Sequence, residues 1–164
     1  MSQLNNISNK LLSLEDLLLN LPVWKQQGKI VFTNGCFDIL HLGHLDYLGK
    51  ASELGHKLIV GLNTDSSVKR LKGASRPVNN EYARAMTLAN LAVVDAIVLF
   101  EEDTPYELIK RIVPNVLVKG SDYLVEEIVG HEIVLGNGGS VITINLLEGY
   151  STTCIIEKMQ NGQD

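Results

Sequence analysis

The sequence of 164 residues predicts a single α/β domain with a doubly wound, five-stranded parallel sheet. Short, almost continuously apolar runs recur along the chain, which is typical of strands that are buried on both faces. Helical patterns separate these runs, so consecutive strands are expected to be parallel and joined by helices. No internal repeat, low-complexity segment or linker interrupts this alternation.

The strands follow from the apolar runs. Five are expected, at residues 29–33, 57–62, 96–100, 116–118 and 141–146. Before them, a dense leucine pattern within residues 8–27 predicts a helical leader, which Gly28 ends. We therefore divide the chain into a leader, residues 1–28, and a main part, residues 29–164, that together form one domain.

The helices follow from periodicity and capping residues. Gly55 ends the first one after the leader, and residues 63–65 and Ser151 supply N-caps for later ones. Pro105 is expected just inside the start of another helix. Residues 72–80 are expected to form an irregular loop. The expected helices span residues 44–54, a short segment ending at Leu71, 81–92, a segment starting at Thr104-Pro105, a short stretch within 125–136, and a last one to about Gln160.

Composition excludes several classes of protein. The net charge of −5 argues against a general nucleic-acid binder, which normally has a basic face. No apolar run approaches the roughly 20 residues that span a bilayer, and no signal peptide is recognisable. The two cysteines, Cys36 and Cys154, do not make a disulfide framework and favour a reducing compartment. A cytoplasmic protein that binds neither nucleic acid nor membrane is expected.

Polar segments, three of which contain glycine, follow four of the expected strands. They are residues 35–44, 63–65, 119–123 and 148–153. Because ligands of such sheets bind beyond the carboxyl ends of the strands, these segments predict a nucleotide site. The sequence contains neither a GxxxxGK[ST] loop nor a GxGxxG fingerprint, so the common P-loop and dinucleotide sites are excluded.

The segment Thr33–His44 is the most informative part of the chain. It joins a buried strand to a helix, and the N-terminus of a helix favours anions such as phosphate. His41 and His44 lie three residues apart, on one face of the helix start. Their alternatives are a capping or packing role, or a zinc site that would need Cys36 as a third ligand.

At this point the residues resemble a known family. His41-Leu42-Gly43-His44 matches the HxGH signature of the HIGH-type nucleotidyltransferases, and the longer match Gly35-x-Phe37-Asp38-x-x-His41-x-Gly43-His44 resembles their cytidylyltransferase-like branch. Gly120-x-Asp122 and Gly149-x-Ser151-Thr152-Thr153 resemble two further motifs of that branch. The resemblance implies a Rossmann-like fold and nucleotidyl transfer.

Within that branch, the chain most resembles the heptose 1-phosphate adenylyltransferases. This resemblance covers roughly residues 10–160 and includes the segments Thr33–His41, Ser67–Gly73, Arg76–Asn79, Phe100–Pro105 and Val118–Gly120. It implies transfer of AMP from ATP to D-glycero-β-D-manno-heptose 1-phosphate, giving ADP-heptose and pyrophosphate for a lipopolysaccharide or surface glycan. Mg²⁺ is expected to be carried with ATP rather than held by a protein metal site. The resemblance also implies a homodimer, and a stand-alone enzyme, since the chain has no kinase half.

The resemblance implies a role for each matching residue. Catalytic roles are expected for His41, His44 and Lys72. Substrate binding is expected for Lys72 and, because they follow the second strand at the edge where ligands bind, for Asn63 and Asp65. Nucleotide binding is expected for Asn34, Gly35, Cys36, Phe37, Gly43, His44, Arg84, Lys119, Gly120, Asp122, Tyr150, Ser151, Thr152 and Thr153. Some of these have structural alternatives: a solvated helix end for Lys72, an ion pair with Glu81 for Arg84, and a turn-forming role for Asp122.

Alternative functions remain open. A related enzyme could use CTP or another phosphorylated acceptor such as glycerol 3-phosphate. Cytidylyltransferases for that acceptor usually carry an Arg-Thr pair where this chain has Leu146-Leu147, which weakens this alternative. A nucleotide-binding module without catalysis is a second alternative. A thiol-based redox protein is a third, and the absence of any CxxC argues against it.

Overall fold

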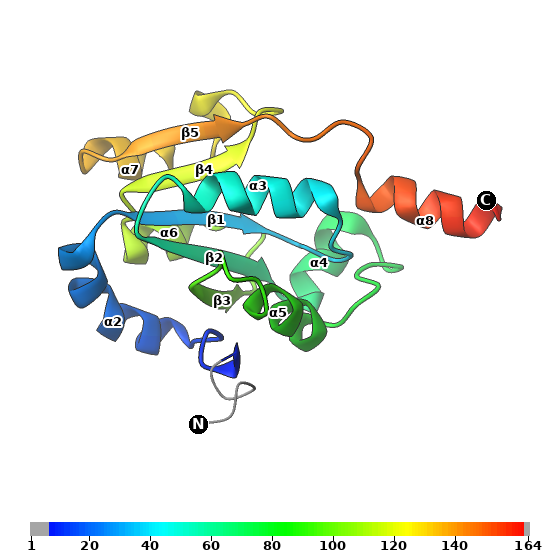
Figure 1. Ribbon diagram of the computed structural model, residues 1–164, viewed down its shortest axis with the longest axis horizontal. Helices are drawn as coiled ribbons and strands as arrows, with labels where there is room; N and C mark the ends of the chain where they lie inside the picture. Colours follow the sequence, from blue (N-terminus) through cyan, green and yellow to red (C-terminus); the bar gives the residue numbers. More distant parts are fainter. Residues whose placement is uncertain (1–6, 163–164) are drawn as a thin grey trace.

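The computed structural model describes residues 7–162 of the chain. At its centre lies a five-stranded parallel sheet in the order β3-β2-β1-β4-β5 (Figure 1). The strands are β1 (Ile30–Gly35), β2 (Lys57–Asn63), β3 (Ala96–Phe100), β4 (Val116–Gly120) and β5 (Ser140–Ile144). The predicted fold class is confirmed, and each strand lies within a few residues of its predicted position.

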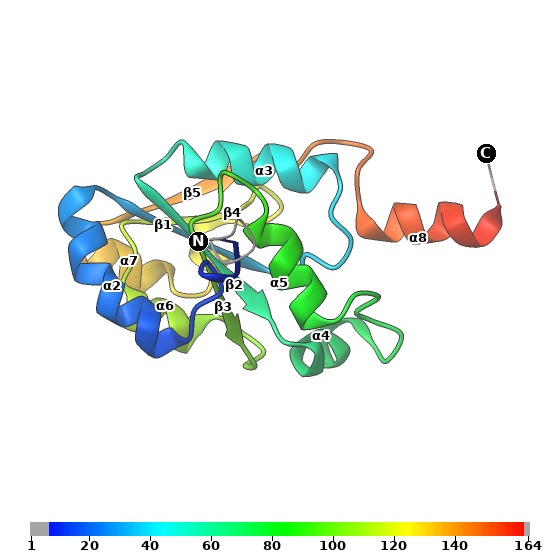
Figure 2. The same cartoon turned by 60° about the horizontal axis from the view of Figure 1, so that its bottom comes forward.

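Helices cover both faces of this sheet (Figure 2). One face carries α3 (Leu42–Ser52) and α5 (Glu81–Ala89), and the other carries α2 (Leu14–Gln27), α6 (Tyr106–Ile112) and α7 (His131–Gly136). Successive side chains of a strand point to opposite faces, so Val31 belongs to the first hydrophobic cluster while Ile30 and Phe32 belong to the second. Burial of both faces explains why the strands are apolar throughout.

The order of the strands creates a binding crevice. The chain runs outward from β1 through β2 to β3, then crosses back to place β4 on the other side of β1. At their carboxyl ends β1 and β4 therefore lead their following segments in opposite directions, which opens a crevice between them. Three further helical elements lie around this edge: α4 (Asp65–Lys72), the 3₁₀ helix η1 (Val125–Glu127) and α8 (Thr152–Asn161).

The prediction of one helix over residues 8–27 was wrong in its first part. The helix begins at Leu14, where the Ser13 hydroxyl accepts a hydrogen bond from the Asp16 N–H at 3.0 Å. Ahead of it the chain is extended beside β3, with the Leu12 N–H donating to the Ile97 carbonyl at 2.9 Å. The leucines of this segment are therefore explained by packing against the edge of the sheet.

Other boundaries moved by a few residues. Helix α3 begins at Leu42, two residues before the prediction, so Gly43 and His44 belong to its first turn. Pro105 is the N-cap of α6 instead of its first residue, so this helix begins one residue later than predicted. Residues 125–136 are divided between η1 and α7. Strand β5 ends at Ile144, and the connection that follows it leads to the cavity described below.

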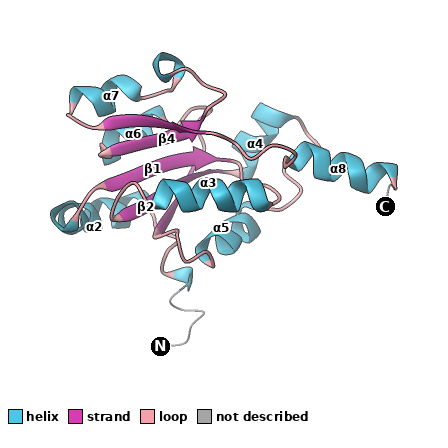
Figure 3. Ribbon diagram, turned by 45° about the horizontal axis from the view of Figure 1, so that its top comes forward, coloured by secondary structure: helices cyan, strands magenta, loops and turns pink. Residues whose placement is uncertain are grey.

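The last helix has few contacts with the domain. Figures 1 and 3 show α8 projecting from the body of the molecule at the carboxyl edge of the sheet. None of its residues is buried, and its Ser151 N-cap accepts a hydrogen bond from the Cys154 N–H at 3.0 Å, as the sequence predicts. No helix within residues 7–162 is long and apolar enough to span a membrane.

Candidate active site

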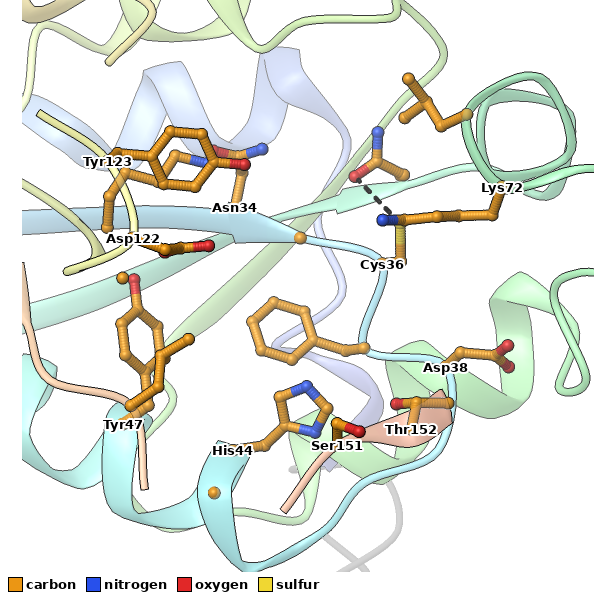
Figure 4. A pocket seen from close by; sticks show the side chains of 18 of the residues that line it. Asn34, Cys36, Asp38, His44, Tyr47, Lys72, Asp122, Tyr123, Ser151 and Thr152 are labelled. Carbon is orange, nitrogen blue, oxygen red and sulfur yellow. Dashed lines mark hydrogen bonds between the residues drawn. The ribbon is translucent and has the colours of Figure 1, made fainter. Parts of the chain in front are cut away.

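A cavity of about 620 Å³ opens at the carboxyl edge of the sheet (Figure 4). Its walls come from the ends of β1, β2 and β4, from the starts of α3 and α8, and from the loops that follow α4 and β3. Most residues singled out from the sequence line this cavity: Asn34, Gly35, Cys36, Phe37, His41, Gly43, His44, Asn63, Lys72, Lys119, Gly120, Asp122, Tyr150, Ser151, Thr152 and Thr153. Segments more than 100 residues apart in sequence thus meet at one place, as the parallel topology requires.

The turn between β1 and α3 forms the floor of the cavity. Phe37 has a positive φ of 43°, a conformation that non-glycine residues rarely adopt and that costs about 1–3 kcal/mol. The turn is tight, since a Cβ on Gly35 would lie 3.0 Å from the Phe37 ring. Such strain persists only where the surroundings impose it, and it directs the chain into α3 with its first turn facing the cavity.

The two histidines stand at the start of α3. Their rings stack with centroids 3.9 Å apart, and the Phe37 ring lies 5.2 Å from that of His44. The Nδ1 atoms of both histidines are buried and have no hydrogen-bond partner among the described residues. A buried polar atom without a partner costs free energy, so these atoms mark a place where a ligand can bind.

Burial keeps both histidines neutral. It lowers the pKa of His44 to about 4, with a further contribution from His41 and an opposing one from the backbone of Ile39. Burial also lowers the pKa of His41. Near pH 7 each ring therefore has one N–H donor and one acceptor nitrogen. Neutral imidazoles can donate hydrogen bonds to phosphate oxygens without carrying a fixed charge.

Positive charge comes from three side chains around the cavity. Lys72 ends α4 and extends towards Cys36, as Figure 4 shows. Lys119 lies near the end of β4, where burial lowers its pKa to about 8, while Asp122 and the Cys36 thiol favour its charged form. Arg76 lies on the loop between α4 and α5. Neither lysine ammonium has a hydrogen-bond partner among the described residues, so both are free to meet an anion.

Asp38 connects the β1–α3 turn to the loop at residues 76–79. Its buried carboxylate accepts hydrogen bonds from Arg76 Nε at 2.7 Å and from the Val78 and Asn79 N–H groups at 2.9 Å. Burial alone would raise the pKa of Asp38, but these donors outweigh it and hold the pKa below its ordinary value. Asp38 therefore positions Arg76 at the rim of the cavity.

The opposite wall comes from the segments after β4 and β5. A Cβ on Gly120 would lie 2.5 Å from Asp122 Oδ1, so a larger residue there would displace the Asp122 carboxylate. Gly43 is also crowded, because a Cβ there would lie 3.1 Å from the His41 ring and 3.3 Å from Tyr150 Cβ. The Thr152 hydroxyl donates to the Ile39 carbonyl at 3.4 Å, which joins α8 to the β1–α3 turn.

The structure places two of the expected site residues behind the cavity. Arg84 is buried and donates to the carbonyls of Cys36 and Asn79, at 2.7 and 3.0 Å, and to Asp65 Oδ1 at 2.8 Å. Because its N–H groups are used by these acceptors, the Arg84 guanidinium supports the backbone of the β1–α3 turn instead of facing the cavity. The ion pair with Glu81 was wrong: Glu81 instead accepts a hydrogen bond from the Asp65 N–H at 2.8 Å.

Several cavity residues were not expected from the sequence. They are Asp38, Tyr47, Leu71, Arg76, Asp103, Thr104, Pro105, Tyr123, Glu127, Ile128, Val129, Leu146 and Leu147. Some belong to segments that resemble the adenylyltransferases, notably residues 76–79 and 100–105, so the resemblance could have indicated that they lie in the site. No motif pointed to Tyr47, whose hydroxyl pairs with Thr33 Oγ1 at 2.7 Å inside the fold. Both cysteines are free thiols.

The described residues offer no protein-only metal site. Within residues 7–162, no three His, Cys, Asp or Glu side chains are grouped so that they could hold a metal ion. The Cys36 thiol instead lies 4.0 Å from Asn63 Oδ1, and burial raises its pKa. The zinc alternative considered for the histidine pair therefore gains no third ligand in this geometry.

Comparison with known proteins decides the family. The family model described as cytidylyltransferase-like matches residues 32–158, which include every residue that lines the cavity. The chain belongs to the cytidylyltransferase-like family. Membership confirms the enzyme class expected from the sequence, a nucleotidyltransferase. The HxGH segment within the match contains His41 and His44, whose Nδ1 atoms have no hydrogen-bond partner among the described residues.

Curated relatives of this cytidylyltransferase-like chain are named "Bifunctional protein HldE". The protein from Rhodopseudomonas palustris (strain BisB18) is 57% identical over 149 residues, which cover 90% of this chain and 30% of the relative. The protein from a Nitratiruptor species is 56% identical over 144 residues, 88% of this chain and 30% of the relative. The chain thus spans about a third of the length of the curated relatives it matches.

Solved structures share the fold of this cytidylyltransferase-like domain. A lipopolysaccharide core biosynthesis protein from Thermoplasma volcanium GSS1 aligns with a TM-score of 0.61 and 27% identity, covering 76% of this chain and 99% of that one. A pantoate-beta-alanine ligase from Francisella tularensis aligns with a TM-score of 0.63 over 94% of this chain and 79% of that one. At 16% identity the ligase supports the fold alone.

Proposed function

We propose that this chain transfers AMP from ATP to D-glycero-β-D-manno-heptose 1-phosphate, releasing pyrophosphate and forming ADP-heptose. The observation that carries the transfer chemistry is the stacked pair of neutral histidines with unpartnered Nδ1 atoms, in the same cavity as Lys72 and Lys119. The choice of acceptor is supported by the identity of 57% to a relative named HldE and by the motifs that resemble heptose 1-phosphate adenylyltransferases. A cytoplasmic homodimer is part of the same proposal.

The reaction is a single in-line displacement. An oxygen of the acceptor phosphate attacks the α-phosphorus of ATP, the bond from that phosphorus to the bridging oxygen breaks, and pyrophosphate leaves. The attacking phosphate is already ionised near pH 7, so no strong general base is required. The protein has to hold two anions that repel each other and stabilise the charge that develops on the α-phosphate.

The cavity residues divide this work. His41 and His44 donate N–H groups to the α- and β-phosphates, and Gly43 leaves room for the triphosphate beside them. Lys72 and Arg76 attract the acceptor phosphate, and Lys119 adds positive charge on the β4 side. Ser151, Thr152 and Thr153 present hydroxyl groups and the N-terminus of α8 to the nucleotide.

Magnesium fits the cavity as an ion that is carried with ATP. Mg²⁺ usually keeps several waters and binds through one or two carboxylates plus substrate phosphates. Asp38 is occupied by Arg76 and by two backbone N–H groups, whereas Asp122 lines the cavity without a hydrogen-bond partner among the described residues. Asp122 is therefore one carboxylate of the cavity that would take a coordination position, and the ion would neutralise phosphate charge.

The proposal is tested by measuring pyrophosphate release. The purified chain is incubated with each of ATP, CTP, GTP and UTP, in combination with heptose 1-phosphate, other sugar 1-phosphates or glycerol 3-phosphate. We expect release with ATP and heptose 1-phosphate, and ADP-heptose identified by mass spectrometry. Release with CTP and glycerol 3-phosphate instead would contradict both the nucleotide and the acceptor. No release with any pair, together with measurable ATP binding, would favour a nucleotide-binding module.

A further inference from the structure

The two sides of the cavity differ in chemical character. On the side of β4 and β5, Tyr123, Leu146, Leu147 and Tyr150 present aromatic and aliphatic surface beside the charged Lys119 and Asp122. On the side of β2 and β3, Leu71 and Pro105 are apolar, and the rest of the lining is polar and comes from Asn63, Lys72, Arg76, Asp103 and Thr104. A nucleotide base needs flat apolar surface, whereas a phosphorylated sugar needs charges and hydrogen-bonding groups. The first side therefore suits the base, and the second suits the acceptor.

The loop after β3 forms part of the polar side, and hydrogen bonds join it to α4. Arg70 Nε donates to Asp103 Oδ1 at 2.8 Å, and a second nitrogen of Arg70 donates to the Glu101 carbonyl. The Ser67 hydroxyl donates to the Glu102 carbonyl at 3.1 Å. Since α4 ends at Lys72, these contacts fix Asp103 relative to the lysine that faces the acceptor phosphate.

The structure leaves part of Asp103 free to bind a ligand. Only Oδ1 is used by Arg70, and Oδ2 has no hydrogen-bond partner among the described residues. A carboxylate can accept hydrogen bonds from two neighbouring hydroxyl groups, and the hydroxyl of Thr104 can both donate and accept. The segment at residues 100–105 also resembles the adenylyltransferases, yet the transfer chemistry itself gives it no role.

Building on the proposed function, we infer that Asp103 and Thr104 recognise the hydroxyl groups of the acceptor's sugar, and that Arg70 is a positioning residue that holds Asp103. The acceptor then has two separate handles. Its phosphate meets Lys72 and Arg76, and its ring meets the loop after β3. This arrangement distinguishes a sugar phosphate from a simpler phosphorylated acceptor by the hydrogen bonds that only the sugar supplies.

The direction of the change in KM for the sugar 1-phosphate distinguishes binding of sugar hydroxyl groups by Asp103 from simple charge repulsion. An Asp103 that is only a solvated negative charge near the acceptor would repel the acceptor phosphate, so Asp103→Asn would lower KM for the sugar 1-phosphate or leave it unchanged. If Asp103 binds sugar hydroxyl groups, the same change raises that KM by about 10- to 100-fold, as expected for a lost hydrogen bond to a charged group.

The experiment compares Asp103→Asn with Glu102→Gln in the pyrophosphate-release assay. Glu102→Gln removes the same charge from the same loop. Glu102 lines a separate cavity with Leu14 and Arg111, so we expect this variant to have wild-type kinetics. For Asp103→Asn we expect a raised KM for the sugar 1-phosphate, an unchanged KM for ATP, and unchanged inhibition by inorganic phosphate. Circular dichroism checks that both variants are folded.

The positioning role of Arg70 has a separate readout. Arg70→Gln should raise KM for the sugar 1-phosphate and leave KM for ATP unchanged. The double variant with Asp103→Asn should have a KM for the sugar 1-phosphate no higher than that of the single variants, because both changes disrupt the same Arg70–Asp103 pair. Additive effects would overturn that role. An Asp103→Asn enzyme with an unchanged acceptor KM, or with an equal rise in KM for ATP, would overturn the inference alone. No turnover by the wild type with ATP and heptose 1-phosphate would overturn the proposed function as well.

Discussion

The imidazole rings of His41 and His44 stack with their planes inclined by 23° and their centroids 3.9 Å apart. Burial disfavours a positive charge on His44, and the neighbouring His41 adds a smaller effect of the same sign, so the pKa of His44 is about 4. The pair therefore enters any reaction at neutral pH as two uncharged hydrogen-bond donors.

Replacing His44 should remove catalysis without unfolding the protein. We expect His44→Ala to lower kcat by about 100- to 1000-fold, the usual cost of losing one donor to a developing charge. The measurement is the steady-state rate of pyrophosphate release. The matched control is His56→Ala, since His56 is exposed and lies outside the cavity, and this variant should retain wild-type kcat. A folded His44→Ala enzyme with near-normal kcat would exclude the donor role.

The stability of the protein should fall in mild acid, partly because of His44. Its pKa is about 4 in the folded state and close to its ordinary value of 6.5 in the unfolded chain, so only the unfolded chain binds a proton between these values. The stability that depends on an uncharged His44 is fully present above about pH 6.5 and is lost as the pH falls towards 4. Urea unfolding should therefore show a shallower loss of stability over this pH range for His44→Gln than for the wild type. Parallel curves would contradict the prediction.

Removing the Asp38 carboxylate should loosen the loop at residues 76–79. Asp38 is only 3% exposed, and its loss leaves Arg76 and two N–H groups without their acceptor, so we expect Asp38→Ala to cost about 3 kcal/mol in the free energy of unfolding. The control is Asp46→Ala, which breaks an exposed i,i+4 pair with Lys50 and should cost less than about 1 kcal/mol. Chemical denaturation measures both, and equal costs would count against the role of Asp38.

Gly120→Ala should weaken nucleotide binding. The added Cβ would lie 2.5 Å from Asp122 Oδ1, so the Asp122 carboxylate has to move. We expect KM for ATP to rise about tenfold, equivalent to roughly 1.4 kcal/mol of binding, with the fold retained. In Gly136→Ala the new Cβ has no atom within 4 Å, so that variant should bind ATP normally. An unchanged KM in Gly120→Ala would show that the turn tolerates a shifted Asp122.

Local patterns predicted most of the fold because they report on burial. The apolar run that became β3 was predicted with its observed ends, Ala96 and Phe100, since both faces of that strand are covered. The segment at residues 10–12 was not predicted, because its leucines suit a helix equally well. Only the unpaired edge of β3, more than 80 residues away in sequence, explains why the chain is extended there.

Side-chain direction limited what could be predicted for the site. A strand–helix turn locates His41 and His44 from sequence alone, because their positions follow from the start of a helix. Arg84 lies on a correctly predicted helix, but its guanidinium turns towards Asp65 and the carbonyl of Cys36 instead of the cavity. Asp103 lies on a loop whose path depends on Arg70, a contact that no local pattern encodes.

The pairing of Leu11 with Ile97 also has a consequence for how the molecule behaves among its copies. A parallel sheet that ends in a bare outer strand offers free backbone groups to any neighbouring chain, which is a common route to aggregation. Here the chain before α2 covers that strand, with hydrogen bonds from Leu12 to Ile97 at 2.9 Å and from Ile97 to Lys10 at 2.7 Å. A segment that takes no part in the proposed chemistry thus shields one flank of the sheet against edge-to-edge association.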